Sequence, residues 1–116
     1  MRGLVKSFKV LSDETRLRVI NLLLERECCV CEVMQALDVS QSRASRNLGI
    51  LEDAGFVRSR RDGLWIVYSV EEQRMKSYTA PLIGLLRNSL VNEEIILQDR
   101  ERLSQAVRVG PKAIHR

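Results

Sequence analysis

The chain has 116 residues, a formal net charge of +4 at pH 7 and a sequence pI near 9.3. This length fits one domain with a modest core, and since only 4% of the residues are aromatic, Leu, Val and Ile must supply the packing. No run approaches the roughly 20 apolar residues that a membrane-spanning helix needs. The first residues carry no secretory signal, so we expect a cytoplasmic protein whose cysteines stay reduced.

The first part of the chain predicts three short helices. Residues 4–11 form an amphipathic segment, and Ser12 and Asp13 offer N-cap side chains for a second helix with apolar residues at helical spacing. Residues 27–29 end that helix. Residues 30–37 then form a third one, so the chain is mainly helical up to this point.

A fourth helix and a β-hairpin follow. Ser40 is a natural N-cap for a helix over residues 41–54, which Gly55 would end as the C′ residue. Residues 56–70 change to a β pattern around an Asp-Gly turn at residues 62–63, which is a strong hairpin signal. Two helices around a short turn, followed by a basic hairpin, are typical of a winged helix-turn-helix.

The last part of the chain predicts one long helix and a tail. Pro81 suits the first position of a helix that runs through Leu103. We therefore expect a mainly α fold with a β-hairpin wing, which dimerises through its N- and C-terminal helices. We expect residues 1–109 to form this winged helix-turn-helix domain and residues 110–116 to form a disordered tail.

The helix predicted over residues 41–54 has one face suited to DNA. Ala44, Leu48 and Leu51 fall together on a narrow core face. The opposite face carries small hydroxyls and arginine, which fit a major groove and can reach base edges or phosphates. The alternative is a helix with an ordinary polar exterior and a hairpin whose charges protect an edge strand. The predicted DNA-binding residues are Gln41, Ser42, Arg43, Ser45 and Arg46, with Arg60 and Arg61 in the wing.

All three cysteines lie within four residues, at Cys28, Cys29 and Cys31. Crowded thiolates select soft ions, such as zinc, copper(I), cadmium or trivalent arsenic and antimony. On a regular helix, residues two apart point about 200° from each other, so Cys29 and Cys31 can share an ion only where the helix is irregular or distorted. The three cysteines are the candidate metal ligands. The alternative is that they are small core residues.

At this point the sequence resembles the ArsR/SmtB family of bacterial metal- and metalloid-responsive repressors. The similarity runs from LSDETRLRVINLLL through SQSRASRNLGILEDAGFVRSRRDGLWIVYSV. The segment ECCVCEV at residues 27–33 resembles E-L-C-V-C-D-L of the arsenical-resistance repressors, which puts the family's cysteine pair on Cys29 and Cys31. The resemblance implies a homodimer, not an enzyme, that represses an arsenic or antimony resistance operon. Arsenite or antimonite would act as inducer and release double-stranded operator DNA, with no permanent cofactor.

The sequence departs from the family pattern at several positions. Met34 stands where some of these repressors carry a third cysteine, and Cys28 stands where they carry leucine. The third thiolate therefore comes from Cys28, or the site uses two thiols. The family's other metal site, on the last helix, has no counterpart because the only histidine is His115. Asn47 also replaces a histidine common in the DNA-reading helix.

Other functions remain open from the sequence. The cysteines could form a redox switch on the same DNA-binding fold. They could instead sense cadmium, lead or a methylated trivalent arsenical. A thiol-dependent enzyme or a protein-interaction module finds little support, because no histidine lies near enough to the cysteines in the sequence to suggest activation of a thiol.

Overall fold

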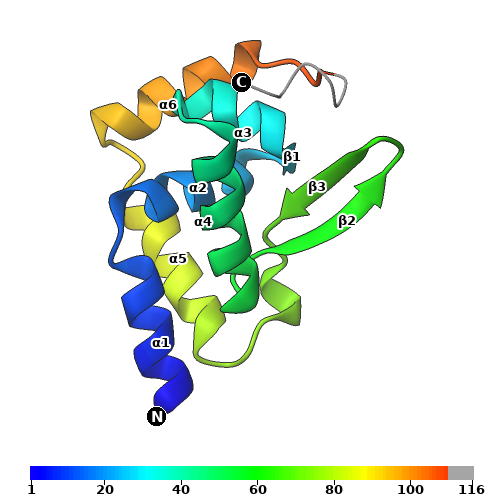
Figure 1. Ribbon diagram of the computed structural model, residues 1–116. Coiled ribbons are helices and arrows are strands. Elements are labelled where there is room, and N and C mark those ends of the chain that lie inside the picture. Colours follow the sequence, from blue (N-terminus) through cyan, green and yellow to red (C-terminus); the bar gives the residue numbers. More distant parts are fainter. Residues whose placement is uncertain (110–116) are drawn as a thin grey trace.

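Six α-helices, three short strands and one turn of 3₁₀ helix make up residues 1–109, the part of the chain that the computed structural model describes (Figure 1). The predicted tail at residues 110–116, with His115, lies outside these residues. The elements are α1 (Arg2–Leu11), α2 (Glu14–Glu25), β1 (Cys28–Cys29), α3 (Val30–Leu37), α4 (Gln41–Asp53), β2 (Arg58–Asp62), β3 (Trp65–Ser69), η1 (Glu72–Arg74), α5 (Thr79–Ser89) and α6 (Glu94–Gln105).

Local capping sets the helix boundaries that the sequence predicts. The Asp13 side chain accepts a hydrogen bond from the Arg16 N–H at the start of α2, and Ser40 does the same for the Arg43 N–H at the start of α4. These bonds satisfy amides that have no partner inside the helix. Gly55 follows α4 with φ +84°, a conformation that favours glycine. The two N-caps and the Gly55 stop are confirmed.

The core lies among α2, α3 and α4. Ala44, Leu48 and Leu51 of α4 are fully buried, as their spacing predicts. Ile20 of α2 and Phe56, which follows α4, are fully buried in the same apolar cluster. This packing fixes α4 against α2 and α3, and leaves its other face free.

The predicted hairpin forms, although Gly63 and Leu64 make its turn instead of the predicted Asp62-Gly63 pair, and it belongs to a three-stranded sheet. The strand order is β1-β3-β2, and both pairs are antiparallel. Residues 27–29 are predicted as a break, whereas Cys28 and Cys29 pair with Tyr68 and Val67 as an edge strand. A two-residue strand has no sequence period of its own, and it exists because β3 offers it hydrogen bonds.

The prediction of one long C-terminal helix is wrong. The structure has two helices, α5 and α6, with residues 90–93 between them. Pro81 is the third residue of α5 rather than the first, which is tolerated because amides in the first turn of a helix need no intrahelical acceptor. The break lets α6 return to α2 and α3, where the Asp99 carboxylate pairs with Arg18 and the Leu103 carbonyl accepts from Arg26.

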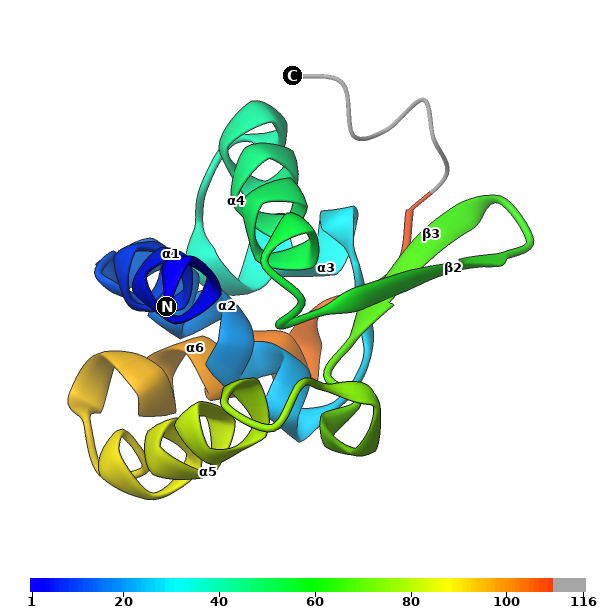
Figure 2. The same cartoon turned by 90° about the horizontal axis from the view of Figure 1, so that it is seen from below.

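The wing lies on the opposite side of the molecule from α1 and α5. The β2–β3 hairpin projects from one side, and α1 lies across the helical body from it, with α5 on the same side as α1 (Figures 1 and 2). No helix within residues 1–109 is long and apolar enough to cross a membrane. Helices α1 and α5 thus form a helical face that is separate from the wing.

Candidate thiol site and nucleic-acid interface

Cys29 and Cys31 come together because the first of them precedes the helix. Cys29 is the N-cap of α3, with extended backbone angles (φ −83°, ψ 169°), and Cys31 is the second helical residue. The irregular start required for two thiols to converge is therefore already present in the fold. The Cys31 thiol lies close enough to Cys29 to help raise the pKa of the Cys29 thiol. Both side chains line one small pocket.

Cys28 points the other way. Successive residues of a strand face opposite sides of the sheet, so Cys28 enters the apolar core while Cys29 faces the pocket. Its Sγ bonds to the Arg26 carbonyl at 3.4 Å. Within residues 1–109 no three His, Cys, Asp or Glu side chains converge as a metal-binding group. The structure thus brings two of the three predicted ligands together and leaves Cys28 apart from them.

We predict that Cys28 makes the fold sensitive to alkali. Burial raises the pKa of this thiol from 9.0 to about 12. In the unfolded chain the thiol ionises above its ordinary pKa, so its contribution to stability is complete below pH 9 and is lost progressively up to pH 12. Between pH 9 and roughly pH 10.5 the free energy of unfolding should fall by about 1.5–2 kcal/mol more in the native protein than in Cys28→Ala. Urea titrations at both pH values would measure this, and equal pH slopes for the two proteins would contradict it.

Glu32 stabilises the first turn of α3 by hydrogen bonding, and its carboxylate pairs with two arginines. Its Oε1 accepts a hydrogen bond from the Cys29 N–H at 2.9 Å, and the Cys29 sulfur accepts one from the Glu32 N–H. Burial opposes ionisation of Glu32, but the Cys29 N–H, Arg26 and Arg108 outweigh it, and its pKa lies below the usual value. Cysteine at an N-cap with glutamate three residues later resembles a capping box. That pattern could have identified Glu32 from the sequence.

The Cys29 thiol is neutral at physiological pH. Burial raises its pKa, and the hydrogen bond with Cys31 raises it further, while the hydrogen bond with the Glu32 backbone opposes both. The surroundings of Cys29 therefore disfavour its thiolate, which forms when a ligand bonds the sulfur directly.

Residues 106–109 lie across the thiol site and join it to the wing. The Gln35 side chain donates to the Val107 carbonyl and accepts from its N–H, and the Trp65 indole donates to the Val109 carbonyl at 2.8 Å. The Arg108 guanidinium bonds Glu32 and Asp62 and lies 5.7 Å from the centre of the Trp65 ring. These contacts border a half-open apolar pocket of about 150 Å³, lined by Cys29, Val30, Cys31, Leu64, Trp65, Ile66 and Val109.

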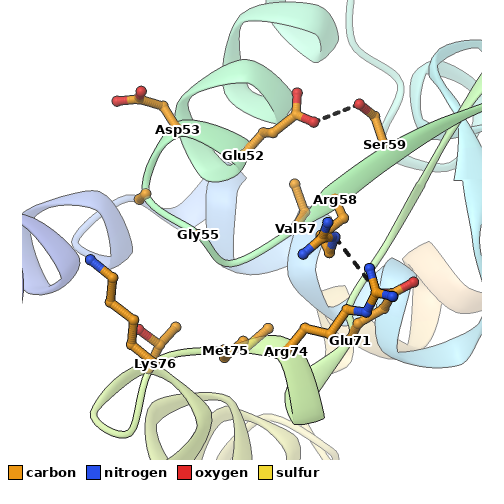
Figure 3. Close-up of a pocket in the computed structure, with 12 residues that line it drawn as sticks. Glu52, Asp53, Gly55, Val57, Arg58, Ser59, Glu71, Arg74, Met75 and Lys76 are labelled. Atoms are coloured by element: carbon orange, nitrogen blue, oxygen red, sulfur yellow. Dashed lines mark hydrogen bonds and ion pairs between the residues drawn. The ribbon is translucent and has the colours of Figure 1, made fainter.

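A larger cavity of about 410 Å³ lies at the base of the wing, where α4 ends and β2 and η1 begin (Figure 3). Glu71 pairs there with Arg58 and Arg74, and the Glu52 carboxylate accepts a hydrogen bond from the Ser59 hydroxyl. It contains no cysteine. We therefore assign the thiol chemistry to the smaller pocket.

The exposed face of α4 is polar, as predicted. Ser42, Ser45 and Arg46 are exposed, whereas Gln41 at the start of the helix is half-buried. Arg43 is exposed, but its guanidinium donates to the Thr15 hydroxyl at 2.8 Å. Asn47 does not belong to this face. It is buried, accepts from Arg16 and donates to the Arg43 carbonyl, so it ties α4 to α2.

The wing presents its two predicted arginines differently. Every side chain of β2 is exposed. Arg60 pairs with Glu27, beside β1, and Arg58 on the same face pairs with Glu71. Arg61 lies on the opposite face of the strand, opposite Ile66 in register. Arg61 is thus directed away from the carboxylates that hold its neighbours.

The known proteins that resemble this chain in sequence are bacterial regulatory proteins. The family model described as "Bacterial regulatory protein, arsR family" matches residues 13–59. Over 99 residues the chain is 37% identical to the arsenic resistance transcriptional regulator ArsR1 of Pseudomonas putida, covering 84% of this chain and 75% of that protein. Over 65 residues it is 45% identical to the arsenical resistance operon repressor of Escherichia coli, covering 55% of this chain and 56% of that protein.

A solved structure supports the same fold. The homodimeric winged helix-turn-helix DNA-binding domain of a possible ArsR-family transcriptional regulator from Mycobacterium bovis superimposes with a TM-score of 0.65 at 28% identity. The superposition covers 74% of this chain and 76% of that one. The predicted winged helix-turn-helix fold is thereby confirmed.

Proposed function

This chain belongs to the arsR family of bacterial regulatory proteins, and we propose that it represses an arsenic or antimony resistance operon and leaves its operator when trivalent arsenic binds Cys29 and Cys31. One observation carries the proposal. The thiols of Cys29 and Cys31 line one pocket at the N-terminus of α3, the helix that packs beneath α4. A ligand at this position acts directly on the support of the DNA-reading helix.

We propose that α4 enters the major groove with its N-terminal half. Arg46 has an open side chain on the exposed face and can bond a guanine edge in a bidentate manner. Arg43 and Arg60 would exchange their bonds with Thr15 and Glu27 for phosphate oxygens. The proposed DNA contacts are Gln41, Ser42, Arg43, Ser45 and Arg46 of α4, and Arg60 and Arg61 of the wing.

We propose that two copies pair through α1, α5 and α6. These helices expose large apolar side chains, with 52% of Phe8, 60% of Leu85 and 52% of Leu97 accessible in the isolated chain. Burying such side chains against a second copy is favourable. A two-fold dimer would present two copies of α4 to successive turns of the major groove.

Arsenic binding at the pair requires no redox step. Arsenous acid carries three hydroxyls, and two of its As–O bonds break while As–S bonds form to Cys29 and Cys31. Each thiol proton leaves with a hydroxide as water, so the exchange is balanced. Cys28 could join only if β1 separated from β3, because its side chain faces the core.

The ligand would weaken DNA binding through the start of α3. Cys29 is both a strand residue and the N-cap, and its sulfur accepts the Glu32 N–H. Arsenic would take that sulfur, so the first turn of α3 must adjust, and α4 with it. A tenfold loss of DNA affinity needs only about 1.4 kcal/mol of coupling.

The test is fluorescence anisotropy of the reduced protein on labelled DNA from upstream of its own gene, titrated with arsenite. We expect arsenite to release the DNA from the native protein and from Cys28→Ser. Cys29→Ser and Cys31→Ser should bind the DNA as the native protein does, and arsenite should not release it from them at any concentration. DNA release from both of these variants would contradict the thiol site.

Titrations of the protein–DNA complex with peroxide and with cadmium test the two alternative functions that the sequence leaves open. Release by peroxide without arsenite, reversed by a dithiol, would indicate a redox switch. Release by cadmium alone would indicate a soft-cation sensor. The proposal expects neither agent to replace arsenite at equal concentration.

A further inference from the structure

We propose that the thiol pair and its apolar pocket select trivalent arsenicals that carry one organic group, preferably the size of an aromatic ring. This inference rests on the proposed function and names its ligand class. It depends on three features: the number of facing thiols, the lining of the pocket and its volume.

Two facing thiols leave one arsenic valence for another group. Cys29 and Cys31 line the pocket, whereas Cys28 lies in the core on the other face of β1. Arsenite held by two sulfurs would keep one hydroxyl. An arsenical of the form R–As(OH)₂ has two exchangeable positions and matches the pair, with R as its third substituent.

The third substituent would face apolar side chains. Val30 adjoins the pair on α3, and Leu64, Trp65 and Ile66 reach the same pocket from the wing. Burying a hydroxyl against such a lining without a hydrogen-bond partner is unfavourable, whereas burying a hydrocarbon group is favourable. Arg108, the charged group beside Trp65, is engaged with Glu32 and Asp62.

The pocket volume fits a ring. At about 150 Å³ it equals the engineered apolar cavity, of roughly 150 Å³, that is known to bind benzene in another protein. A methyl group would fill only part of this space. The ring would also touch α3 and the wing together, which links the ligand to both elements that approach DNA.

The binding step balances without an oxidant or reductant. Two As–O bonds of R–As(OH)₂ break, two As–S bonds form to Cys29 and Cys31, and two water molecules leave with the thiol protons. The As–C bond is unchanged and arsenic stays trivalent.

The test uses Trp65, the only tryptophan of the chain, as a fluorescence reporter in the wall of the pocket. The reduced full-length protein is titrated with phenylarsine oxide, methylarsonous acid and arsenite in the absence of DNA. One methylene in an apolar pocket changes discrimination by roughly tenfold or more, so we expect the phenyl compound to bind at least about tenfold more tightly than the methyl compound.

Ile66→Asn tests the pocket itself, and Ile66→Val is its matched control. Ile66 is 42% exposed, so neither change removes a core residue. Ile66→Asn should reduce phenylarsine oxide affinity by about tenfold and leave arsenite affinity within about twofold, while Ile66→Val preserves both.

The outcomes separate this inference from the proposed function. Equal affinities for the three arsenicals, or an equal loss of all three in Ile66→Asn, would overturn the organic-group preference and leave the arsenic sensor standing. No binding of any arsenical by protein that still binds its DNA would overturn the inference and the proposed inducer together.

Discussion

Asp99→Ala is expected to lower the free energy of unfolding by about 2–4 kcal/mol, because it leaves the half-buried Arg18 guanidinium without its carboxylate partner. Asp99 lies on α6 with 1% of its surface exposed, and both carboxylate oxygens bond the Arg18 guanidinium of α2 at 2.8 Å. The Asp99 hydrogen bond raises the pKa of Arg18 above its ordinary value, against the effect of burial. Urea denaturation at neutral pH would measure the loss.

Glu101→Ala is the matched control for Asp99. Glu101 is an exposed acid on the same helix, so its removal should change stability by no more than about 0.5 kcal/mol. The double variant Arg18→Met/Asp99→Leu should recover most of the loss, because apolar residues of similar volume can replace a buried ion pair. A loss below about 1 kcal/mol in Asp99→Ala would show that this pair does not hold α6 to α2.

Arg46→Ala is expected to weaken operator binding by at least about tenfold. A bidentate arginine–guanine contact contributes roughly 1–3 kcal/mol of discrimination, and a dimer makes the contact twice. Arg46 is exposed on α4 and outside the core, so stability should change little. Anisotropy titrations on operator and on scrambled DNA would separate base reading from phosphate contact, since only the former depends on sequence.

Arg102→Ala controls for the loss of one positive charge. Arg102 is an exposed arginine of α6, outside the α4 face and the wing. Its replacement should leave operator affinity within about twofold at moderate salt. An equal loss of affinity in the two variants would contradict the assignment of α4 as the reading helix.

Features fixed by neighbouring residues could be predicted from the sequence. The Asp13 and Ser40 caps and the Gly55 stop act within one helical turn. The buried face of α4 follows from helical spacing, and the hairpin from its Asp-Gly pair. These local signals were sufficient for the winged helix-turn-helix order.

Features fixed by distant residues could not be predicted. Strand β1 forms because β3 pairs with it from about 40 residues further along the chain. The break between α5 and α6 serves a contact between Asp99 and Arg18, which are 81 positions apart. A periodic apolar pattern continues across that break and therefore does not reveal it.

Some features of the candidate site could likewise be predicted from the sequence, and others could not. The cysteine cluster and the polar face of α4 are visible in the sequence. The separation of Cys28 from Cys29 and Cys31 depends on strand alternation in β1, which the sequence did not reveal. Arg108 reaches Glu32 across 76 positions, so its place beside the thiols needs the folded chain.

The most direct test of the two-thiol arsenic site is X-ray absorption at the arsenic edge of the reduced protein loaded with one equivalent of arsenite. We expect arsenic with two sulfur neighbours and one oxygen neighbour, and loss of the sulfur signal in Cys29→Ser/Cys31→Ser. Arsenic with oxygen neighbours only, or a sulfur signal that survives in the double variant, would contradict it. Three sulfur neighbours would mean that Cys28 leaves the core, which would contradict the two-thiol site.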